Sequence, residues 1–218
     1  MRIVIALLTL LTVQTSLSAQ TEQTGDQEFV NEVMRKGVTK SVSDRQILRE
    51  QYQFDVIKNQ KTSGNEGASD SLSIEELFGR VRYRYEMDYD VPLSLSGRPV
   101  YLINFFPESD NQPDAPKGAN QRGKIKNEIL NHLRGTVYVD QDDFGIVRVV
   151  THANNPPEKI FIVGRLYSME STLEQDRLGE IWVPREIVVK AEFSYFLGWH
   201  HSHDNTSFEF YNFRLKAP

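Results

Sequence analysis

The sequence predicts a mainly β protein of the α+β class. We expect one large, strongly curved antiparallel sheet with about two helices packed on a single face. Segments with strand periodicity follow one another through short polar turns, and so short a connection can join only antiparallel neighbours. Amphipathic helical patterns are few, and helices of this kind pack on one face of such a sheet.

The chain begins with a segment typical of a secretory signal peptide. Residues 1–19 contain one basic residue, Arg2, then an apolar run over 3–13 and small or polar residues up to Ala19. The apolar run is about half as long as the roughly 20 residues that a membrane-spanning helix needs. We therefore expect cleavage after Ala19 and a periplasmic mature protein, residues 20–218, without a transmembrane segment.

Composition excludes several classes of protein. The 218 residues include no cysteine, which rules out a disulfide framework and a lipid-modified N-terminal cysteine. The net charge is −5 at pH 7 and no run of basic residues occurs, so a nucleic-acid partner is not expected. A chain of this length can bury the core of a single domain.

The first part of the mature chain predicts one helix and one strand. Residues 28–38 place four apolar side chains on one helical face, and Gly37 is the predicted end of that helix. A strand is predicted at 51–57. Two polar segments without periodicity, 20–27 and 59–72, are predicted to be mobile.

The clearest strand pattern covers residues 81–91. Apolar side chains occupy every odd position and polar ones every even position, which predicts a long strand with one face in water. The odd positions are Val81, Tyr83, Tyr85, Met87, Tyr89 and Val91. In contrast, residues 98–107 are apolar on both sides, as in a central strand covered on both faces.

The C-terminal half predicts one more helix and then strands alone. Residues 124–135 place Ile125, Ile129, Leu130 and Leu133 on one side of a helix that Gly135 would end. Strands follow on both sides of polar turns at 141–145 and 176–179, and a final strand is predicted at 206–215.

Three of the five histidines, His200, His201 and His203, lie within four positions. Asp204 and Asn205 follow, and both residue types favour turns, so an exposed hairpin loop is the simpler interpretation. The alternative is a zinc site, because His201 and His203 would share one side of an extended strand. A metal-dependent hydrolase needs a third ligand and a general base as well, and the sequence supplies neither.

The segment 140–145 has some features of a calcium-binding loop. Asp140, Asp142 and Gly145 stand at the first, third and sixth positions of such a loop. However, Phe144 and Thr151 occupy the fifth and twelfth positions, where that site needs suitable oxygen donors. We therefore expect a hairpin turn between two strands. The chain also lacks the motifs of nucleophilic catalysis and of phosphate-binding loops, so no cofactor is expected.

The functional prediction depends on the aromatic side of residues 81–91. These side chains could simply pack under the helices, or they could form one wall of an apolar groove. Burial of an acyl chain in such a groove is worth roughly 0.8 kcal/mol per methylene before ordering costs. We predict a hydrophobic cavity lined by Tyr83, Tyr85, Met87, Tyr89, Phe105 and Phe106.

Four segments, 96–108, 130–149, 179–193 and 209–215, resemble in their order the periplasmic outer-membrane lipoprotein-sorting proteins, the LolA/LolB-like half-barrels. In that family a Gly-x-Val-Tyr-Val-Asp type of strand, here Gly135 to Asp140, precedes a hairpin into an arginine-containing strand, here with Arg148. A later segment has glycine before Trp-hydrophobic-Pro, here Gly179 to Pro184. The likeness covers about residues 81–215.

The resemblance implies that the curved sheet forms an open half-barrel, with two or three helices packed on its concave face as a lid over a hydrophobic cavity for lipid. We therefore predict a periplasmic, non-enzymatic carrier that binds lipid or the acyl chains of lipoproteins. Two alternatives remain. One is the hydrolase centred on His200, His201 and His203, and the other is an envelope sensor or assembly module that binds a peptide as an added strand.

Overall fold

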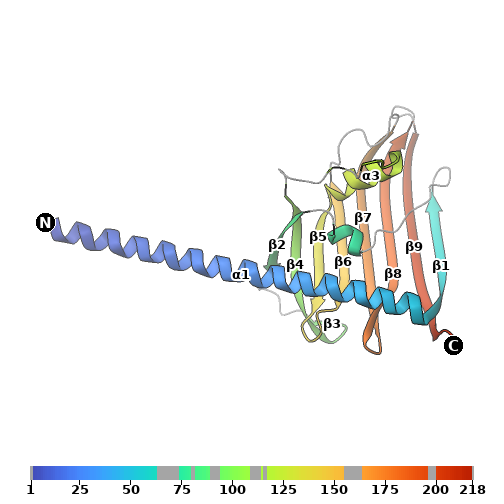
Figure 1. Cartoon of the computed structure of the whole chain (residues 1–218). Helices are drawn as coiled ribbons and strands as arrows, with labels where there is room; N and C mark the ends of the chain where they lie inside the picture. The colour runs from blue at the N-terminus through green and yellow to red at the C-terminus, as the bar shows by residue number, and fades with distance from the viewer. Residues whose placement is uncertain are drawn as a thin grey trace.

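The computed structural model describes the backbone of residues 2–62, 74–79, 82–88, 94–108, 114, 117–154, 164–195 and 200–217. Within the first helix, it describes side chains from Asp26 onward. The described segments form one open antiparallel sheet with helices on one face, as the sequence predicts (Figure 1).

The sheet has nine strands in the order β1-β9-β8-β7-β6-β5-β4-β2, and β3 pairs with β4 outside this path. The strands are β1 (Tyr52–Thr62), β2 (Tyr83–Asp88), β3 (Ser94–Leu95), β4 (Arg98–Pro107), β5 (Arg134–Asp140), β6 (Ile146–Asn154), β7 (Gly164–Leu178), β8 (Ile181–Tyr195) and β9 (His200–Leu215). The helices are α1 (Arg2–Gln51), α2 (Ile74–Phe78) and α3 (Gln121–Leu130).

The topology is a meander with one long return. Strands β4 to β9 each pair antiparallel with the next strand along the chain. Short turns require this between β5 and β6, and between β7 and β8, whereas α3 lies in the connection from β4 to β5. Strand β1 pairs with β9, so it lies at the edge opposite β2 although both strands come from the first half of the chain. The backbone amide of Lys216 donates to the carbonyl of Gln51, which joins the end of β9 to the junction between α1 and β1.

Helix α1 crosses one face of the sheet from the β2 side to the β1 side (Figure 1). Its buried side chains recur at helical spacing: Val30, Val33, Met34 and Leu48. The first three pack on the core above β4 to β6, whereas Leu48 packs on Ile181 and Val183 of β8. The N-terminal part of α1 extends beyond the sheet (Figure 1).

The predicted helix end at Gly37 is wrong, because α1 continues to Gln51. Gly37 is buried and faces the start of β6. A Cβ atom at this position would lie 3.3 Å from both the carbonyl oxygen of Phe144 and the Cγ1 atom of Ile146. The glycine therefore allows close approach of helix and sheet. Residues 20–27, predicted to be mobile, belong to this helix, and 59–62 belong to β1.

The helix end predicted at Gly135 is also wrong. Helix α3 runs from Gln121 to Leu130, and the Asn120 side chain caps its start by accepting the Gly123 amide at 2.9 Å. Gly135 lies inside β5, where a Cβ atom would come within 1.9 Å of the carbonyl oxygen of Val150. This glycine is required by close packing against β6.

The alternation predicted for residues 81–91 is confirmed where the structure describes it. In β2, Tyr83 is buried and Tyr85 and Met87 are half-buried, whereas Arg84 and Glu86 are exposed. Val81, Tyr89 and Val91 lie outside the described residues. The neighbouring strand β4 buries side chains on both faces, as predicted: Ile103 and Phe105 under the helices, and Val100 on the opposite face with Val147 and Trp182.

Candidate functional site

The predicted cavity wall is packed by other side chains of the protein. The ring of Phe78, from α2, lies with its centroid 5.8 Å from that of Tyr83 and 5.2 Å from that of Phe105. Tyr83 and Phe105 are themselves in edge contact at 4.9 Å. The Tyr83 hydroxyl donates to the carbonyl of Leu130 at 3.0 Å, which ties β2 to the end of α3. This part of the sheet therefore belongs to the main core.

Burial in this cluster changes the titration of its phenols. Burial raises the pKa of Tyr85 to about 12, and the nearby negative charge of Glu108 adds to the shift. Burial also raises the pKa of Tyr83, and the Tyr85 phenol contributes further. Both tyrosines thus stay neutral through the physiological range, as apolar core residues with a polar end.

Phe106 lies on the other face of the sheet from Phe105. It pairs across the sheet with Arg84, whose guanidinium carbon lies 5.5 Å from the centre of the Phe106 ring. Tyr89 lies outside the described residues. None of the five described residues of the predicted wall, Tyr83, Tyr85, Met87, Phe105 and Phe106, borders the pocket described next.

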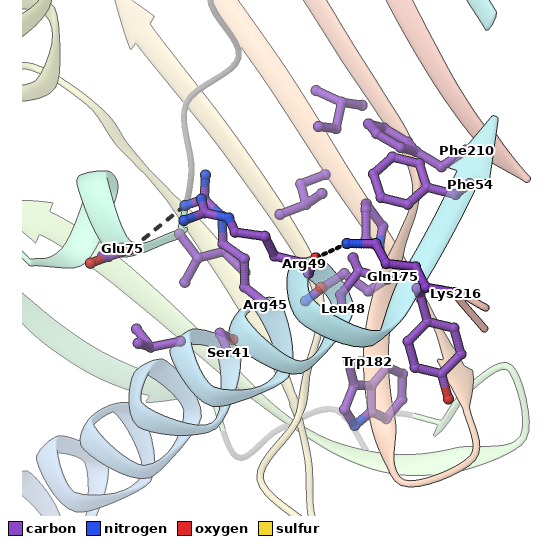
Figure 2. Close-up of a pocket in the computed structure, with 16 residues that line it drawn as sticks. Ser41, Arg45, Leu48, Arg49, Phe54, Glu75, Gln175, Trp182, Phe210 and Lys216 are labelled. Carbon is purple, nitrogen blue, oxygen red and sulfur yellow. Dashed lines mark hydrogen bonds and ion pairs between the residues drawn. The ribbon is translucent and has the colours of Figure 1, made fainter. Parts of the chain in front are cut away.

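A pocket of about 480 Å³ lies in the other half of the molecule, between the C-terminal part of α1, the start of α2 and the strands β7, β8, β9 and β1 (Figure 2). Its size is within the range of small-molecule sites, roughly 300–1,000 Å³. Most of its lining is apolar. The apolar lining side chains are Val42, Leu48, Tyr52, Phe54, Ile74, Leu173, Trp182, Pro184, Ile187 and Phe210.

Strand periodicity explains the apolar floor of the pocket. Ile187 of β8 pairs with Leu173 on one side and with Phe208 on the other, so these side chains share the face under α1. On β9, Phe210 lies two residues further along on the same face, and its ring centroid is 5.8 Å from that of Phe54. The floor is thus continuous from β7 to β1.

The remaining lining is polar and mostly cationic. Arg45 and Arg49 lie one turn apart on α1, which places them on the same helical face (Figure 2). The Nη1 atom of Arg45 lies 3.6 Å from a carboxylate oxygen of Glu75. The Nζ atom of Lys216 donates to the backbone carbonyl of Arg49 at 2.5 Å. All four charged side chains are exposed at the pocket mouth.

Two uncharged polar side chains complete the pocket. Ser41 lies one turn before Arg45, and its hydroxyl is buried without a hydrogen-bond partner among the described residues. Gln175 is fixed, because its Nε2 atom donates to the carbonyl of Ile146. The Ser41 hydroxyl is therefore available to a bound molecule.

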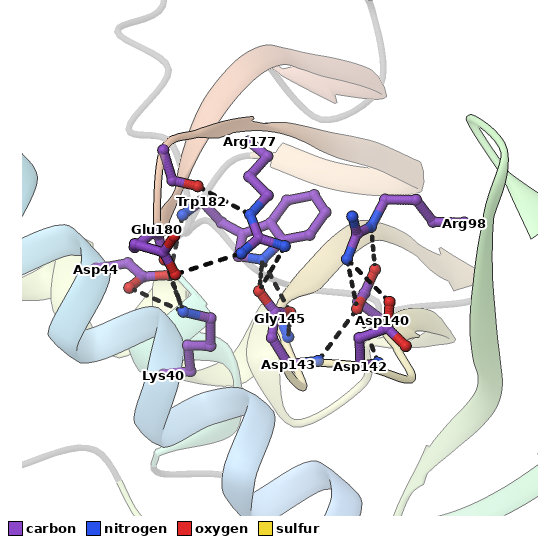
Figure 3. A network of polar contacts seen from close by, with 11 residues as sticks. Lys40, Asp44, Arg98, Asp140, Asp142, Asp143, Gly145, Arg177, Glu180 and Trp182 are labelled. Carbon is purple, nitrogen blue, oxygen red and sulfur yellow. Dashed lines mark hydrogen bonds and ion pairs between the residues drawn. The ribbon is translucent and has the colours of Figure 1, made fainter.

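The helical wall of the pocket is held in place by a polar cluster at the base of β8 (Figure 3). The buried carboxylate of Asp44 accepts the backbone amide of Trp182 at 3.0 Å. Lys40 lies 3.4 Å from Asp44 and donates to the carbonyl of Glu180 at 3.1 Å. Because a buried carboxylate needs such partners, these contacts fix α1 over the start of β8.

The turn at 141–145 belongs to the same cluster and is a hairpin turn, as predicted. The carboxylate of Asp140 accepts the amides of Asp142 and Asp143 and pairs with Arg98 at 2.5 Å. Burial tends to raise the pKa of Asp140, but these hydrogen bonds and the charge of Arg98 outweigh it and lower the pKa below its ordinary value. The acidic side chains are therefore engaged within the fold.

The carboxylate of Asp143 joins this turn to β8. It accepts the Gly145 amide at 2.9 Å and the Trp182 indole Nε1 at 3.1 Å. A Cβ atom at Gly145 would lie 1.8 Å from the same indole nitrogen, so the tryptophan packs directly on this glycine.

The hairpin loop predicted at the histidines is wrong. His200 to Asn205 form the start of β9, where His201 pairs with Ser194 and His203 pairs with Glu192 of β8. Strand pairing overrides the turn preference of Asp204 and Asn205. His201 and His203 do share one side of the strand and are exposed, and the His201 ring stacks on Tyr167 with the centroids 5.4 Å apart.

The described residues contain neither a cluster of metal-binding side chains nor a helix that could span a membrane. Over these segments, no three histidine or acidic side chains come together in a way that could hold a metal ion. No helix within them is both long and apolar enough to cross a membrane.

Comparison with known proteins adds no relative. No protein-family model matches the sequence, and comparisons with curated proteins and with solved structures gave no match. The resemblance to lipoprotein-sorting half-barrels therefore stays a prediction from the residues.

Sequence reasoning missed the pocket because it ended the first helix at Gly37. The signal was present in residues 41–52: Leu48 continues the apolar side of the helix, while Arg45 and Arg49 repeat at one-turn spacing. Continuing the helix through Gly37 would have placed two arginines above the apolar face of the C-terminal strands.

Proposed function

We propose that this protein is a non-enzymatic carrier in the periplasm that binds a lipid, or the acyl chain of a lipoprotein, in the pocket between α1 and the β7–β9 half of the sheet. The observation that carries the proposal is the pocket itself, with its apolar floor and polar mouth. The secretory signal predicted at residues 1–19 supports the location.

The balance of free energy favours an acyl chain over a polar ligand. Leu173, Ile187 and Phe210 offer contacts to methylene groups and no hydrogen-bond donors. Burial of ten methylenes is worth roughly 8 kcal/mol before the cost of ordering the chain. That gross figure corresponds to about micromolar affinity, so binding is reversible once ordering costs are included.

The open sheet and helical cover also agree with the predicted family resemblance. In lipoprotein-sorting half-barrels, helices cover a hydrophobic cavity on the concave face of the sheet. Here the cavity lies nearer β9 and β1 than the sequence predicts. Membership of that family and transfer of cargo are parts of this proposal.

The proposal is tested by measuring whether the protein binds an apolar dye saturably, and whether filling the pocket weakens that binding. The full chain is purified, extracted for lipid mass spectrometry, and titrated with a neutral naphthylamine dye that fluoresces in apolar sites. We expect co-purified lipid and saturable binding of the dye. The substitution Ile187→Trp should weaken dye binding at least tenfold, because the larger side chain fills part of the pocket.

Val188→Trp is the matched control for this experiment. Val188 is next to Ile187 on β8 and is also half-buried, but its side chain lies on the opposite face. The control should bind the dye like the unmodified protein. Equal loss in both variants, or no uptake by the unmodified protein, would contradict the proposal.

A further inference from the structure

The pocket has room for at least one acyl chain. A methylene group occupies about as much space as a water molecule, and a cavity can hold a water molecule once it offers roughly 10–15 Å³ of such space. The pocket of about 480 Å³ exceeds this many times over and is open on one side, so a chain can lie inside while its headgroup stays at the mouth.

The charge of the pocket mouth is opposite to that of the protein. Three cationic side chains, Arg45, Arg49 and Lys216, and one carboxylate, Glu75, line the pocket. The whole chain has a net charge of −5 at pH 7. A local excess of positive charge in an acidic protein attracts anionic groups to this mouth.

The contacts at the mouth leave positive charge available to a ligand. The Arg45–Glu75 pair has its closest atoms 3.6 Å apart, and the side chains are 49% and 59% exposed. Water screens so exposed a pair, and it contributes little. Among the described residues, no carboxylate pairs with Arg49, while Ser41 presents its unpartnered hydroxyl one turn before Arg45.

From these features we infer that the pocket selects an amphiphile with an anionic headgroup, either a carboxylate or a phosphate ester. The inference rests on the proposed function and deepens it by naming the class of ligand. The chain lies on Leu173, Ile187 and Phe210, and the headgroup lies between the two arginines. A guanidinium group suits both anions, because its planar donors bind two oxygen atoms together.

The experiment compares four dodecyl probes that share one chain and differ in their headgroups. Dodecanoate, dodecyl phosphate, dodecanol and dodecyltrimethylammonium each displace the neutral dye from the full chain, below their micelle concentrations. We expect at least one of the anions to bind about tenfold more tightly than dodecanol, and the cation to bind most weakly. The ratio of carboxylate to phosphate affinity identifies the preferred anion.

The double variant Arg45→Gln, Arg49→Gln tests the residues. It should lose about five- to tenfold in affinity for the preferred anion, from two exposed charge contacts, and should bind dodecanol unchanged. Dodecanol binding also shows that the variant is folded. Arg35→Gln is the control, because Arg35 is an exposed arginine of α1 that pairs with Glu32 outside this pocket.

The outcomes separate the two proposals. If no probe displaces the dye because the dye itself does not bind, the proposed function fails. If dodecanol binds as tightly as both anions, or the double variant weakens dodecanol and the anion equally, the inference of anion selection fails while a lipid carrier remains.

Discussion

The two halves of the sheet differ in how their helical cover fills the space above them. Above β2, β4 and β5, the rings of Phe78, Tyr83 and Phe105 contact one another and fill the space between them. Above β7, β8 and β9, a pocket of about 480 Å³ remains. The half that contains the regular aromatic alternation of β2 is thus the filled one, and the pocket lies where the sequence pattern is less conspicuous.

Strand length explains the difference. Strands β2, β4 and β5 have 6, 10 and 7 residues, and the C-terminal end of α2 and the end of α3 join α1 in covering them. Strands β7 and β8 have 15 residues each and β9 has 16. At about 3.3 Å per residue such strands extend about 50 Å, whereas one helix is about 10 Å wide. Since α1 is fixed at the turn end of β8 through Asp44, it covers only part of their length.

The largest expected effect is the loss of stability when the core is cut in the filled half, above β2, β4 and β5. Phe105→Ala should lower the free energy of unfolding by about 3–5 kcal/mol, because the ring is fully buried and contacts two other rings. Leu173→Ala in the hollow half should lower it by about 1–2 kcal/mol, because this half-buried side chain already borders a pocket. Urea unfolding measures both, and equal losses would remove the contrast between the halves.

A smaller effect, dependent on pH, is expected at the cluster that fixes α1 between the halves. Asp140→Asn should lower the free energy of unfolding at pH 7 by about 2 kcal/mol, since the carboxylate is fully buried and bonded to Arg98. The pKa of Asp140 is lower in the folded protein than its unfolded value of about 3.9. Its contribution is therefore complete above that value and is lost as the pH falls through the folded pKa.

Urea unfolding from pH 7 down to acidic pH checks this prediction, and the gap between the variant and the unmodified protein should close at low pH. Asp142→Asn is the control, because this carboxylate in the same turn is 69% exposed and lies 3.5 Å from Arg98. It should change the free energy of unfolding by less than about 0.5 kcal/mol. A gap that stays constant with pH would show that Asp140 acts through packing alone.

The smallest effect concerns one hydrogen bond of the filled half. Tyr83→Phe should lower the free energy of unfolding by about 1 kcal/mol, because it removes the donor to the carbonyl of Leu130 and keeps the ring. Burial raises the pKa of Tyr83 above the unfolded value of about 10. Its neutral form therefore stabilises the fold fully below pH 10, and this contribution is lost as the pH rises through the folded pKa.

The absorbance of tyrosinate during alkaline titration checks the raised pKa values of Tyr83 and Tyr85. Both phenols should ionise only after the other tyrosines, when the protein unfolds. Tyr83→Phe should remove one late-titrating phenol and leave the earlier part of the curve unchanged. If the curve loses a phenol that titrates near pH 10 instead, Tyr83 is not buried as the contacts indicate.

The fold was predictable because its signals are local. Alternation over Tyr83, Tyr85 and Met87 set the faces of β2, and the polar residues 141–143 set the turn between β5 and β6. Short connections then allowed only antiparallel pairing. The exact helix ends were not predictable in this way, since Gly37 and Gly135 serve close packing against Ile146 and Val150, residues distant in sequence.

The site was not predictable from periodicity for a different reason. Aromatic residues on one side of a strand show which face is covered, but they do not show whether the cover fills the space above them. Phe78 fills that space next to Tyr83, and it comes from a helix of five residues that the sequence did not reveal. The pairing of His201 with Ser194 likewise depends on a partner strand, whose contacts override local turn preference.

The sequence by itself determined the class of fold, the antiparallel pairing of strands joined by short turns, and the sides that strands turn to the core, because each depends on neighbours a few residues apart. The tertiary structure decided where the core is solid and where it is hollow. That outcome depends on the path of α1 over strands of unequal length, and therefore on contacts such as Asp44 with Trp182 that join residues far apart in the chain.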